Sequence, residues 1–298
     1  MEVAYDDVIA IDVGRNGVKG ISRNSRSNRL FIPSVVGEYT KLPELGGKLD
    51  SYQVIINDEP CFVGDLALLE SRCLRRMATE SKIHSETKTL FLVALHVLME
   101  SKNPLIITSL PVDQHTTEKK EEFVNLLRGN HIVTVDESTK ALNIETIHAI
   151  TAEAAGPFWN YALSEHAVYY DRDIRGTTRV INIGSRTIDY ATFLGAKYIR
   201  KDCGTLPFGI MELYNGVEKN GQPSDYLKEQ FARRIIGLLS QVWTNFSDED
   251  RVLLSGGGSL ILGKEIKRLY LNSFVPDDAI FGNVNGLLKL GIRLAAKG

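Results

Sequence analysis

The sequence has no surplus of positive charge that would draw it to nucleic acid. It contains 35 lysines and arginines against 37 aspartates and glutamates, a formal net charge of -2. Binding to many phosphates of a nucleic acid requires a clear basic excess. We therefore do not expect this chain to bind nucleic acid directly.

Cysteine is also scarce. Cys61, Cys73 and Cys203 are odd in number, far apart and free of any CxxC spacing. A disulfide framework or a zinc site needs more cysteines at closer spacing. We expect three small buried residues in a reducing compartment.

Long apolar runs are missing as well. The longest one, Leu90 to Met99, contains His96, and a membrane-spanning helix needs about 20 residues. The acidic stretch Met1 to Asp7 leads directly into a strand-like segment, so we expect neither a signal peptide nor a transit peptide. We therefore predict a soluble, cytoplasmic protein without membrane contact.

The 298 residues fit two domains of ordinary size. Residues 8–14 and 17–21 read as two buried strands joined by a glycine-bearing bend, which predicts a β-hairpin. The segment 27–80 mixes short β-like pieces such as 52–56 with turns at Asn57-Asp58 and Gly46-Gly47. It suggests an inserted subdomain.

Strands and helices alternate after this segment. Helical spacing over residues 85–100, a buried strand at 104–111 and a polar helix start at 117–123 follow in turn. Further β stretches at 131–136 and 142–150 lead into the small residues 151–156, which suggest a helix N-terminus. A long amphipathic helix begins near Pro223-Ser224.

One internal repeat links the two halves of the chain. Residues 11–19 can be placed over residues 181–189 so that apolar positions and the glycines Gly14 and Gly184 coincide. Two such strand–turn–strand units could face each other across a cleft that holds a phosphorylated ligand. The match is short, and chance coincidence is the alternative.

Both bends carry groups suited to a phosphate. Glycine lets the backbone amides of a turn approach an anion, with Asn16 and Lys19 as further donors in the first bend. Asp12 supplies a hard oxygen ligand for magnesium, directly or through water. An ordinary turn is the alternative for each hairpin taken alone. The second bend offers Gly184, Ser185, Arg186 and Thr187 as donors and Asp189 as a second carboxylate.

A third segment is more specific. Residues 252–259 read as a buried strand that ends in Gly256, Gly257 and Gly258 before Ser259. Three glycines bring bare backbone close to something flat and bulky. A hinge or a loose surface loop is the alternative.

The order of these segments resembles the actin-like ATPase superfamily, in detail its ParM-like plasmid-segregation and archaeal actin-like branch. Residues 11–19 and 181–189 resemble the two phosphate loops, 254–259 the adenosine motif, and 151–156 the first connecting helix. Residues 281–286 resemble the second connecting helix, and Leu110-Pro111-Val112 also matches that branch. Each motif is weak alone, whereas their common order over nearly the whole chain is specific.

The resemblance implies an α/β actin-like fold, a duplicated ribonuclease H-like unit with a nucleotide cleft between two domains. Domain I would span residues 1–148, with the insertion at about 27–80, and would be completed by the helix 282–298. Domain II would span residues 149–281.

The resemblance also implies roles for single residues. Asp12 would hold the shell of a magnesium ion, and Glu153 would orient the water that attacks ATP; a first-turn acid that favours the helix dipole is the alternative for Glu153. Asp189 and Asn182 would contact the metal through water. The nucleotide would be bound by Gly14, Arg15, Asn16, Lys19, Asn182, Gly184, Ser185, Arg186, Thr187, Gly204, Gly256, Gly257, Gly258 and Ser259.

One residue departs from the family pattern. The second phosphate loop of the family usually opens with aspartate, and the matching residue here is Asn182. An amide can hydrogen-bond a metal-bound water but supplies no charge. This departure puts magnesium affinity and the rate of hydrolysis in doubt more than nucleotide binding itself.

The function that the resemblance implies is a polymerising ATPase with Mg²⁺ and ATP, or GTP, as cofactors. Closure on the nucleotide would create head-to-tail contacts with further copies, and a DNA-binding adaptor would supply a plasmid cargo. Two alternatives stay open: a small-molecule kinase, for which Asp113 is the one candidate base, and a scaffold that binds nucleotide without hydrolysing it. The chain is too short for a DnaK-type chaperone.

Overall fold

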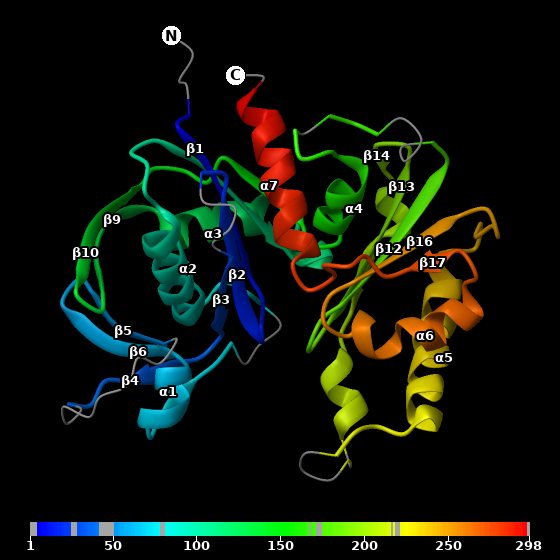
Figure 1. Ribbon diagram of the computed structural model, residues 1–298, viewed down its shortest axis with the longest axis horizontal. Coiled ribbons are helices and arrows are strands. Elements are labelled where there is room, and N and C mark those ends of the chain that lie inside the picture. Colours follow the sequence, from blue (N-terminus) through cyan, green and yellow to red (C-terminus); the bar gives the residue numbers. More distant parts are fainter. Residues whose placement is uncertain are drawn as a thin grey trace. The chain divides into compact units, whose positions relative to one another are not determined.

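Figure 1 shows the computed structural model, which describes residues 5–24, 29–41, 51–77, 81–166, 168–170, 175–215, 217 and 221–296. Its contacts divide the chain into two units. Unit 1 consists of Met1–Leu110, Gln114–Ile150 and Leu294–Gly298, and unit 2 of Pro111–Asp113 and Thr151–Arg293. The predicted turn at Gly46-Gly47 and the N-terminal Met1 to Ala4 lie outside the described residues.

Unit 1 is built on two sheets. The first sheet runs in the order β11 (Ala149–Ala152), β8 (Pro104–Leu110), β1 (Asp7–Val13), β2 (Gly17–Ser22) and β3 (Leu30–Pro33). The second runs β10 (Ser138–Ile144), β9 (Gly129–Val135), β5 (Ser51–Ile56), β6 (Glu59–Gly64), β4 (Val36–Glu38) and β7 (Leu74–Arg75). The helices are α1 (Asp65–Glu70), α2 (Ser85–Leu98) and α3 (Thr117–Leu127), the last capped by the Thr116 side chain.

The strands of the inserted segment pair with strands outside it as well as with one another. Strand β3 lies within 27–80 but pairs with β2 in the first sheet. Strand β5 pairs with β9, far along the chain, with Val54 opposite Val135. The second sheet is therefore shared between strands of the insertion and the β9–β10 hairpin.

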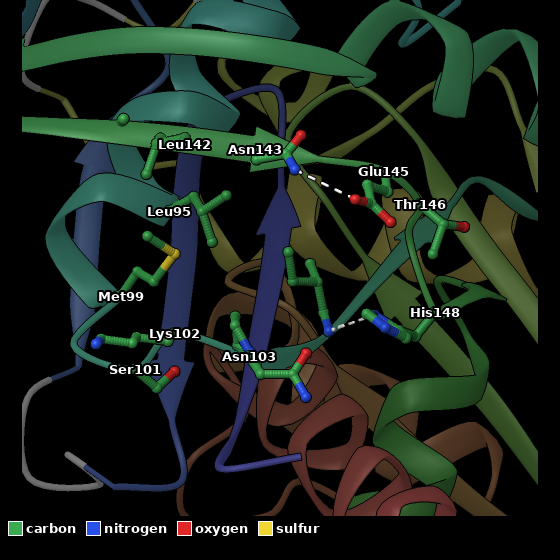
Figure 2. A pocket seen from close by; sticks show the side chains of 13 residues that line it. Leu95, Met99, Ser101, Lys102, Asn103, Leu142, Asn143, Glu145, Thr146 and His148 are labelled. Carbon is green, nitrogen blue, oxygen red and sulfur yellow. Dashed lines mark hydrogen bonds between the residues drawn. The ribbon is translucent and has the colours of Figure 1, made fainter. Parts of the chain in front are cut away.

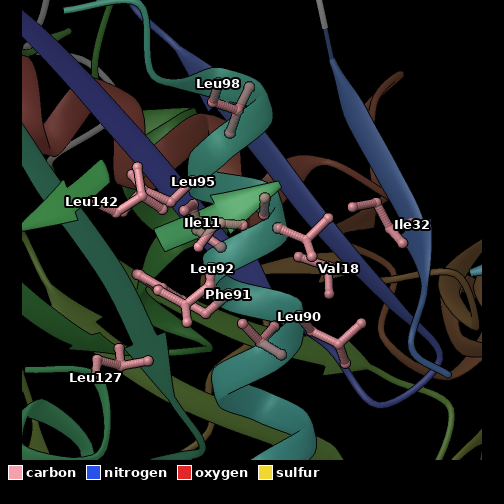
Figure 3. Packing of buried hydrophobic residues seen from close by; sticks show 14 of the residues in the cluster. Ile11, Val18, Ile32, Leu90, Phe91, Leu92, Leu95, Leu98, Leu127 and Leu142 are labelled. Atoms are coloured by element: carbon pink, nitrogen blue, oxygen red, sulfur yellow. The ribbon is translucent and has the colours of Figure 1, made fainter. Parts of the chain in front are cut away.

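Helix α2 forms the centre of the unit 1 core (Figure 3). Leu90, Phe91 and Leu95 are buried, and the cluster that contains them also holds Ile11 and Val18 of the first hairpin. The helix is apolar almost all round, which is the pattern of a helix buried on several sides. This packing holds the β1–β2 hairpin against α2.

Unit 2 is built on one sheet with helices on both faces. The order is β14 (Lys197–Tyr198), β13 (Ile188–Leu194), β12 (Thr177–Ile183), β16 (Arg251–Ser255) and β17 (Ser273–Phe274), with β15 (Gly204–Leu206) on β13. The helices are α4 (Ala155–Ala162), α5 (Asp225–Val242), α6 (Ser259–Leu269) and α7 (Gly282–Ala295). Short 3-10 helices are η1 (Val112–Gln114), η2 (Arg200–Asp202) and η3 (Ile210–Tyr214).

Alternate residues of the central strands face different helices. Ile181 and Ile183 of β12 belong to the buried cluster that contains α5 and α6 residues, whereas Val180 belongs to the cluster that contains Phe158 of α4. Successive side chains of a strand point to opposite faces. The apolar run of β12 is therefore that of a strand buried on both sides.

The first connecting segment begins later as a helix than its composition predicts. Residues 151 and 152 end strand β11, and α4 starts only at Ala155. Alanine favours helix, but pairing of β11 at the edge of the first sheet overrides that weak preference. Glu153 thus precedes the helix, so it is not an acid of the helix's first turn.

The C-terminal helix also differs from the prediction, which assigned it to domain I. A Cβ built on Gly286 would lie 1.7 Å from the carbonyl oxygen of Gly156, so α7 crosses α4 in backbone contact. Lys289 Nζ donates to the carbonyl oxygens of Asn160 and Leu163, each at 3.0 Å. These contacts place α7 up to Arg293 in unit 2.

The cysteines fit the prediction only in part. Cys61 is buried, and burial raises the pKa of its thiol to about 11. Cys203 is half-buried, and its Sγ donates to the Ile199 carbonyl oxygen at 3.1 Å. Cys73 is exposed, contrary to the expectation of three buried residues, because it lies in a bend between α1 and the edge strand β7, whose residues are also exposed.

Unit 2 contains a buried ion pair. Arg179 Nε donates to Asp250 Oδ2 at 2.7 Å, and the two side chains are 1% and 8% exposed. The Arg179 guanidinium also lies 5.1 Å and 5.5 Å from the rings of Trp243 and Phe246. Buried charges are tolerated when they are paired in this way.

Within the described residues, no helix has both the length and the apolar character needed to cross a membrane.

Candidate nucleotide site

The two predicted hairpins have the same geometry. Strand β1 pairs with β2 so that Asp12 faces Lys19, and β12 pairs with β13 so that Asn182 faces Asp189. On their other sides β1 pairs in parallel with β8, and β12 in parallel with β16. The internal repeat predicted from residues 11–19 and 181–189 is therefore confirmed as a structural duplication.

Glycine is required at the same place in both bends. A Cβ on Gly14 would lie 2.7 Å from the carbonyl oxygen of Gly17, and a Cβ on Gly184 would lie 2.9 Å from that of Thr187. Real Cβ atoms essentially never approach a backbone atom below about 3 Å. Each bend is thus too tight for a side chain at this position, which keeps bare backbone at its outer surface.

The carbonyl groups of the first bend are held from one side. Ser34 Oγ donates to the Gly14 carbonyl oxygen, and Ser34 N donates to that of Asn16 at 3.2 Å. In consequence, these carbonyl dipoles are turned toward Ser34. Arg15 lies half-exposed between them, and Asn16 is exposed at the tip.

The second bend is held in a similar way by η3. Ile210 N donates to the Gly184 carbonyl oxygen at 2.9 Å, and Met211 N donates to that of Ser185 at 3.0 Å. A Cβ on Gly209 would lie 2.5 Å from the Arg186 nitrogen, so this bend rests directly on glycine backbone. Carbonyl groups fixed in this manner favour an anion over a cation at the tip.

Two lysines flank the carboxylate of Asp12. Lys19 Nζ lies 3.7 Å from Oδ2, and Lys82 Nζ lies 3.9 Å from Oδ1. Oδ1 is buried without a hydrogen-bond partner among the described residues. An acceptor atom in this state fits a magnesium-bound water, so the site residues of unit 1 are compatible with the predicted metal.

Asp189 has a different environment. It is buried, and its Oδ1 accepts hydrogen bonds from Thr205 Oγ1 at 2.6 Å and from Val112 N at 3.1 Å. The carboxylate therefore holds β15 and the segment 111–113 against β13. Its predicted contact with a metal-bound water remains a prediction.

The glycine loop after β16 lies beside the second hairpin. Gly258 N donates to the Ile183 carbonyl oxygen at 3.0 Å, and a Cβ on Gly256 would lie 2.9 Å from Asn182 Oδ1. Gly256 has φ +80, in the left-handed region that favours glycine. The second hairpin and the predicted adenosine motif are thus one continuous surface of unit 2.

The three glycines of this loop differ in what surrounds them. A Cβ on Gly256 or Gly258 would collide with Ile183, whereas a Cβ on Gly257 would meet nothing within 4 Å. Ser259 Oγ donates back to the Gly256 carbonyl oxygen at 2.7 Å and fixes the start of α6. Gly257 is the exposed member. A loose surface loop, the alternative from sequence, does not fit these contacts.

The remaining predicted residues occupy defined positions. Glu153 is buried, 7% exposed, and the adjacent Ala152 and Ala154 pack on Val180 and Leu253 of the central strands. Gly204 packs under the Tyr190 ring, where a Cβ would lie 2.5 Å from the hydroxyl oxygen. The proximity of Asp113 to Tyr190 adds to burial in raising the pKa of that hydroxyl.

Sequence reasoning missed Lys82 and Ser34. Neither stands in a glycine-bearing motif, and their partners Asp12 and Gly14 lie 70 and 20 positions away. Lys82 stands three residues before the polar start of α2 at Ser85. Lysine at such a position is usually exposed, so the local sequence carries no sign that this one is buried.

Unit 1 also contains a pocket that none of the predicted residues lines (Figure 2). Its volume is about 430 Å³, and Leu95, Ile106 and Leu142 form its apolar part. His148 lies at its edge, accepts a hydrogen bond from Ile106 N at 3.0 Å and has a pKa lowered by burial. None of its lining residues belongs to the two glycine-bearing bends.

Comparisons with known proteins agree with this arrangement. Residues 10–156 match the family described as "Actin like proteins N terminal domain". No curated protein matches the sequence significantly.

Solved structures match over nearly the whole length. Apo ParM of pSK41 is 23% identical, with 98% of each chain covered and a TM-score of 0.76. The ParM of a 15-stranded filament from Clostridium botulinum is 18% identical, with 97% of this chain and 99% of that chain covered and a TM-score of 0.77. AlfA in a filament bound to AMPPNP is 15% identical, with 97% and 98% covered and a TM-score of 0.69.

Proposed function

Since this chain is an actin-like protein, by sequence over residues 10–156 and by fold over nearly its whole length, we propose that it is an ATPase that assembles into filaments. The observation that carries the proposal is the duplicated hairpin with identical register, accompanied in unit 2 by the glycine loop. The AMPPNP-bound AlfA filament, which has the same fold, supports both nucleotide binding and self-assembly.

In this proposal the backbone of both bends binds phosphate oxygens, helped by Arg15, Asn16 and Lys19 in unit 1 and by Asn182, Ser185, Arg186 and Thr187 in unit 2. Gly204, Ser259 and the three glycines before it bind the rest of the nucleotide. When Mg²⁺ is bound, Asp12 would hold its water shell, with Asn182 and Asp189 as further contacts. Magnesium, when bound, would offset negative charge on the phosphate oxygens.

Glu153 has the role of orienting the attacking water and accepting its proton. It is a carboxylate held in a buried position by the strand before it and the helix after it.

The absence of a charge at Asn182 leaves Asp12 as the principal carboxylate toward the metal, and we expect magnesium affinity to be modest. GTP remains an alternative nucleotide.

The self-association that we propose is head-to-tail and open, because such contacts produce filaments when they do not close into a ring. We further propose that the filament segregates plasmid DNA in the cytoplasm through a DNA-binding adaptor. The near-neutral charge of the chain favours an adaptor over direct DNA contact.

The kinase alternative is less well supported. Its only candidate base, Asp113, accepts a hydrogen bond from Thr205 N at 3.1 Å through Oδ1. That carboxylate thus has a structural partner within unit 2. A non-hydrolysing scaffold remains a second candidate because of Asn182.

Right-angle light scattering with parallel phosphate release tests the proposal. Magnesium-ATP added to micromolar protein should produce a rise above a critical concentration, followed by decay as phosphate appears. AMPPNP should give a rise without decay. If neither ATP nor GTP causes a rise, the filament proposal is wrong; hydrolysis without assembly would redirect the search to small hydroxylated acceptors.

The glycine loop gives a matched pair of variants. Gly257→Ala should leave the thermal unfolding midpoint nearly unchanged, because its Cβ enters open space, yet lower the affinity for ATP by about tenfold by intruding on the ligand. Gly258→Ala should destabilise unit 2 by about 1–3 kcal/mol, because its Cβ would lie 2.3 Å from Ile183 Cγ2. Thermal unfolding with and without nucleotide separates the two effects. Unchanged affinity in Gly257→Ala would contradict the proposed contact.

A further inference from the structure

Lys82 is a buried lysine beside the first hairpin. Its side chain is 3% exposed, and its Nζ lies 3.9 Å from Asp12 Oδ1. Its backbone N donates to Gln114 Oε1 at 3.1 Å, and the next residue, Ile83, packs on the unit 1 core. Burying an ammonium group costs several kcal/mol unless an opposite charge or acceptors compensate it. The contacts of Lys82 therefore hold its ammonium group at a fixed position beside Asp12.

The carboxylate that Lys82 approaches is shared with Lys19. The two ammonium groups lie on opposite oxygens, Lys19 at 3.7 Å from Oδ2 and Lys82 at 3.9 Å from Oδ1. Both distances exceed a hydrogen bond. Asp12 is thus held by charge from two sides while Oδ1 has no hydrogen-bond partner among the described residues.

The two lysines differ in what they can reach. Lys19 is on β2 with 18% of its side chain exposed, and its Nζ lies 3.4 Å from the position of a Cβ on Gly14, next to the bend. Lys82 is almost wholly enclosed. Lys19 can therefore contact a ligand at the bend, whereas Lys82 can act only on the protein groups around it, such as Asp12.

We infer that Lys82 is a positioning residue for the reaction proposed above, on which this inference rests. Its fixed charge keeps the Asp12 carboxylate from turning fully toward Lys19. Lys19 thereby remains available to phosphate oxygens, and Asp12 Oδ1 remains available to a water. Without Lys82, Asp12 and Lys19 would form a closed ion pair, and both would be withdrawn from the ligand.

Lys82→Met tests this inference, because methionine has similar length and no charge. Lys88→Met is the matched control, because Lys88 is a half-buried lysine in α2, six residues along the chain. In steady-state ATP hydrolysis we expect kcat of Lys82→Met to fall about 10–100-fold, since misplacing one group can cost about 100-fold. KM should rise as well, because Lys19 is withdrawn from the phosphate oxygens. The control should stay within about twofold of the wild type.

A cycle with Asp12→Asn distinguishes positioning from a general structural role. If Lys82 acts through Asp12, adding Lys82→Met to Asp12→Asn should change kcat by less than about twofold. Independent, multiplying effects would overturn the inference. Lys82→Arg, which restores the charge, should recover part of kcat, and it replaces Lys82→Met if circular dichroism shows that the methionine variant is unfolded.

The outcomes separate the two proposals. A wild type that hydrolyses no nucleotide overturns the proposed function and, with it, this inference. A hydrolysing wild type with an equally active, folded Lys82→Met overturns the inference alone. A fall in kcat for Lys82→Met that recurs in Lys88→Met would also overturn it, because it would show a general effect of charge loss near α2.

Discussion

Glu153→Ala is expected to slow ATP hydrolysis by about 10²–10⁴-fold, the usual contribution of a positioned general base, without preventing assembly. Glu153 is buried between β11 and α4, and its neighbours Ala152 and Ala154 already pack as alanines. Truncation should therefore remove the carboxylate without disturbing the sheet. Light scattering should rise as in the wild type and then persist, because hydrolysis no longer weakens the filament.

Glu153→Gln is the control for shape. It retains a hydrogen-bonding side chain but accepts no proton, so it should resemble alanine in phosphate release and the wild type in thermal stability. Wild-type phosphate release in either variant would exclude Glu153 as the group that activates water. The role would then have to be sought among the other carboxylates of unit 2.

Asp250→Ala is expected to destabilise the protein by about 3–5 kcal/mol, because it leaves the Arg179 guanidinium buried without its counter-ion. The pair is 2.7 Å apart and almost fully enclosed. Urea unfolding followed by the fluorescence of Trp243, which lies 5.1 Å from the guanidinium, should report the loss.

An exposed pair of equal length gives the comparison. Arg233 and Glu229 on α5 are also 2.7 Å apart, but their side chains are 55% and 42% exposed. Glu229→Ala should cost no more than about 0.5 kcal/mol. A loss below about 1 kcal/mol in Asp250→Ala would contradict the assignment of the buried pair as a strong structural contact.

Much of the fold could be predicted from sequence because its signals are local. The hairpin at 11–19 combines buried strands with a glycine that the bend requires, and both features lie within nine adjacent residues. The start of α5 at Asp225 was recognisable from the Ser224 cap, whose side chain accepts from Leu227 N. Such signals do not depend on the rest of the chain.

The errors arose where distant segments meet. The pairing of β5 with β9 joins residues about 80 positions apart, and it moved the insertion into a shared sheet. The backbone contact between Gly156 and Gly286 decided the placement of α7. Neither contact leaves a local pattern, because a glycine in a helix and a strand in an insertion are compatible with several partners.

The candidate site shows the same division. The glycines Gly14, Gly184, Gly256 and Gly258 were predicted and lie where a Cβ would collide with neighbouring atoms, whereas Gly257 faces open space. Lys82 was missed because its partner, Asp12, lies on another element. The engagement of Asp189 with Val112 and Thr205 was equally invisible, since it depends on three separate segments.

The path of the chain between the two units has a consequence for dissecting the protein. Residues 111–113 lie within the stretch that builds unit 1, yet they belong to unit 2, where Val112 N donates to Asp189. A fragment beginning at residue 151 would lack this donor and leave a buried carboxylate short of a partner, at a cost of about 1–3 kcal/mol. Unit 1 in turn draws its last residues from beyond Arg293. Exchange of one unit between related proteins by a single crossover would therefore separate residues that must be inherited together.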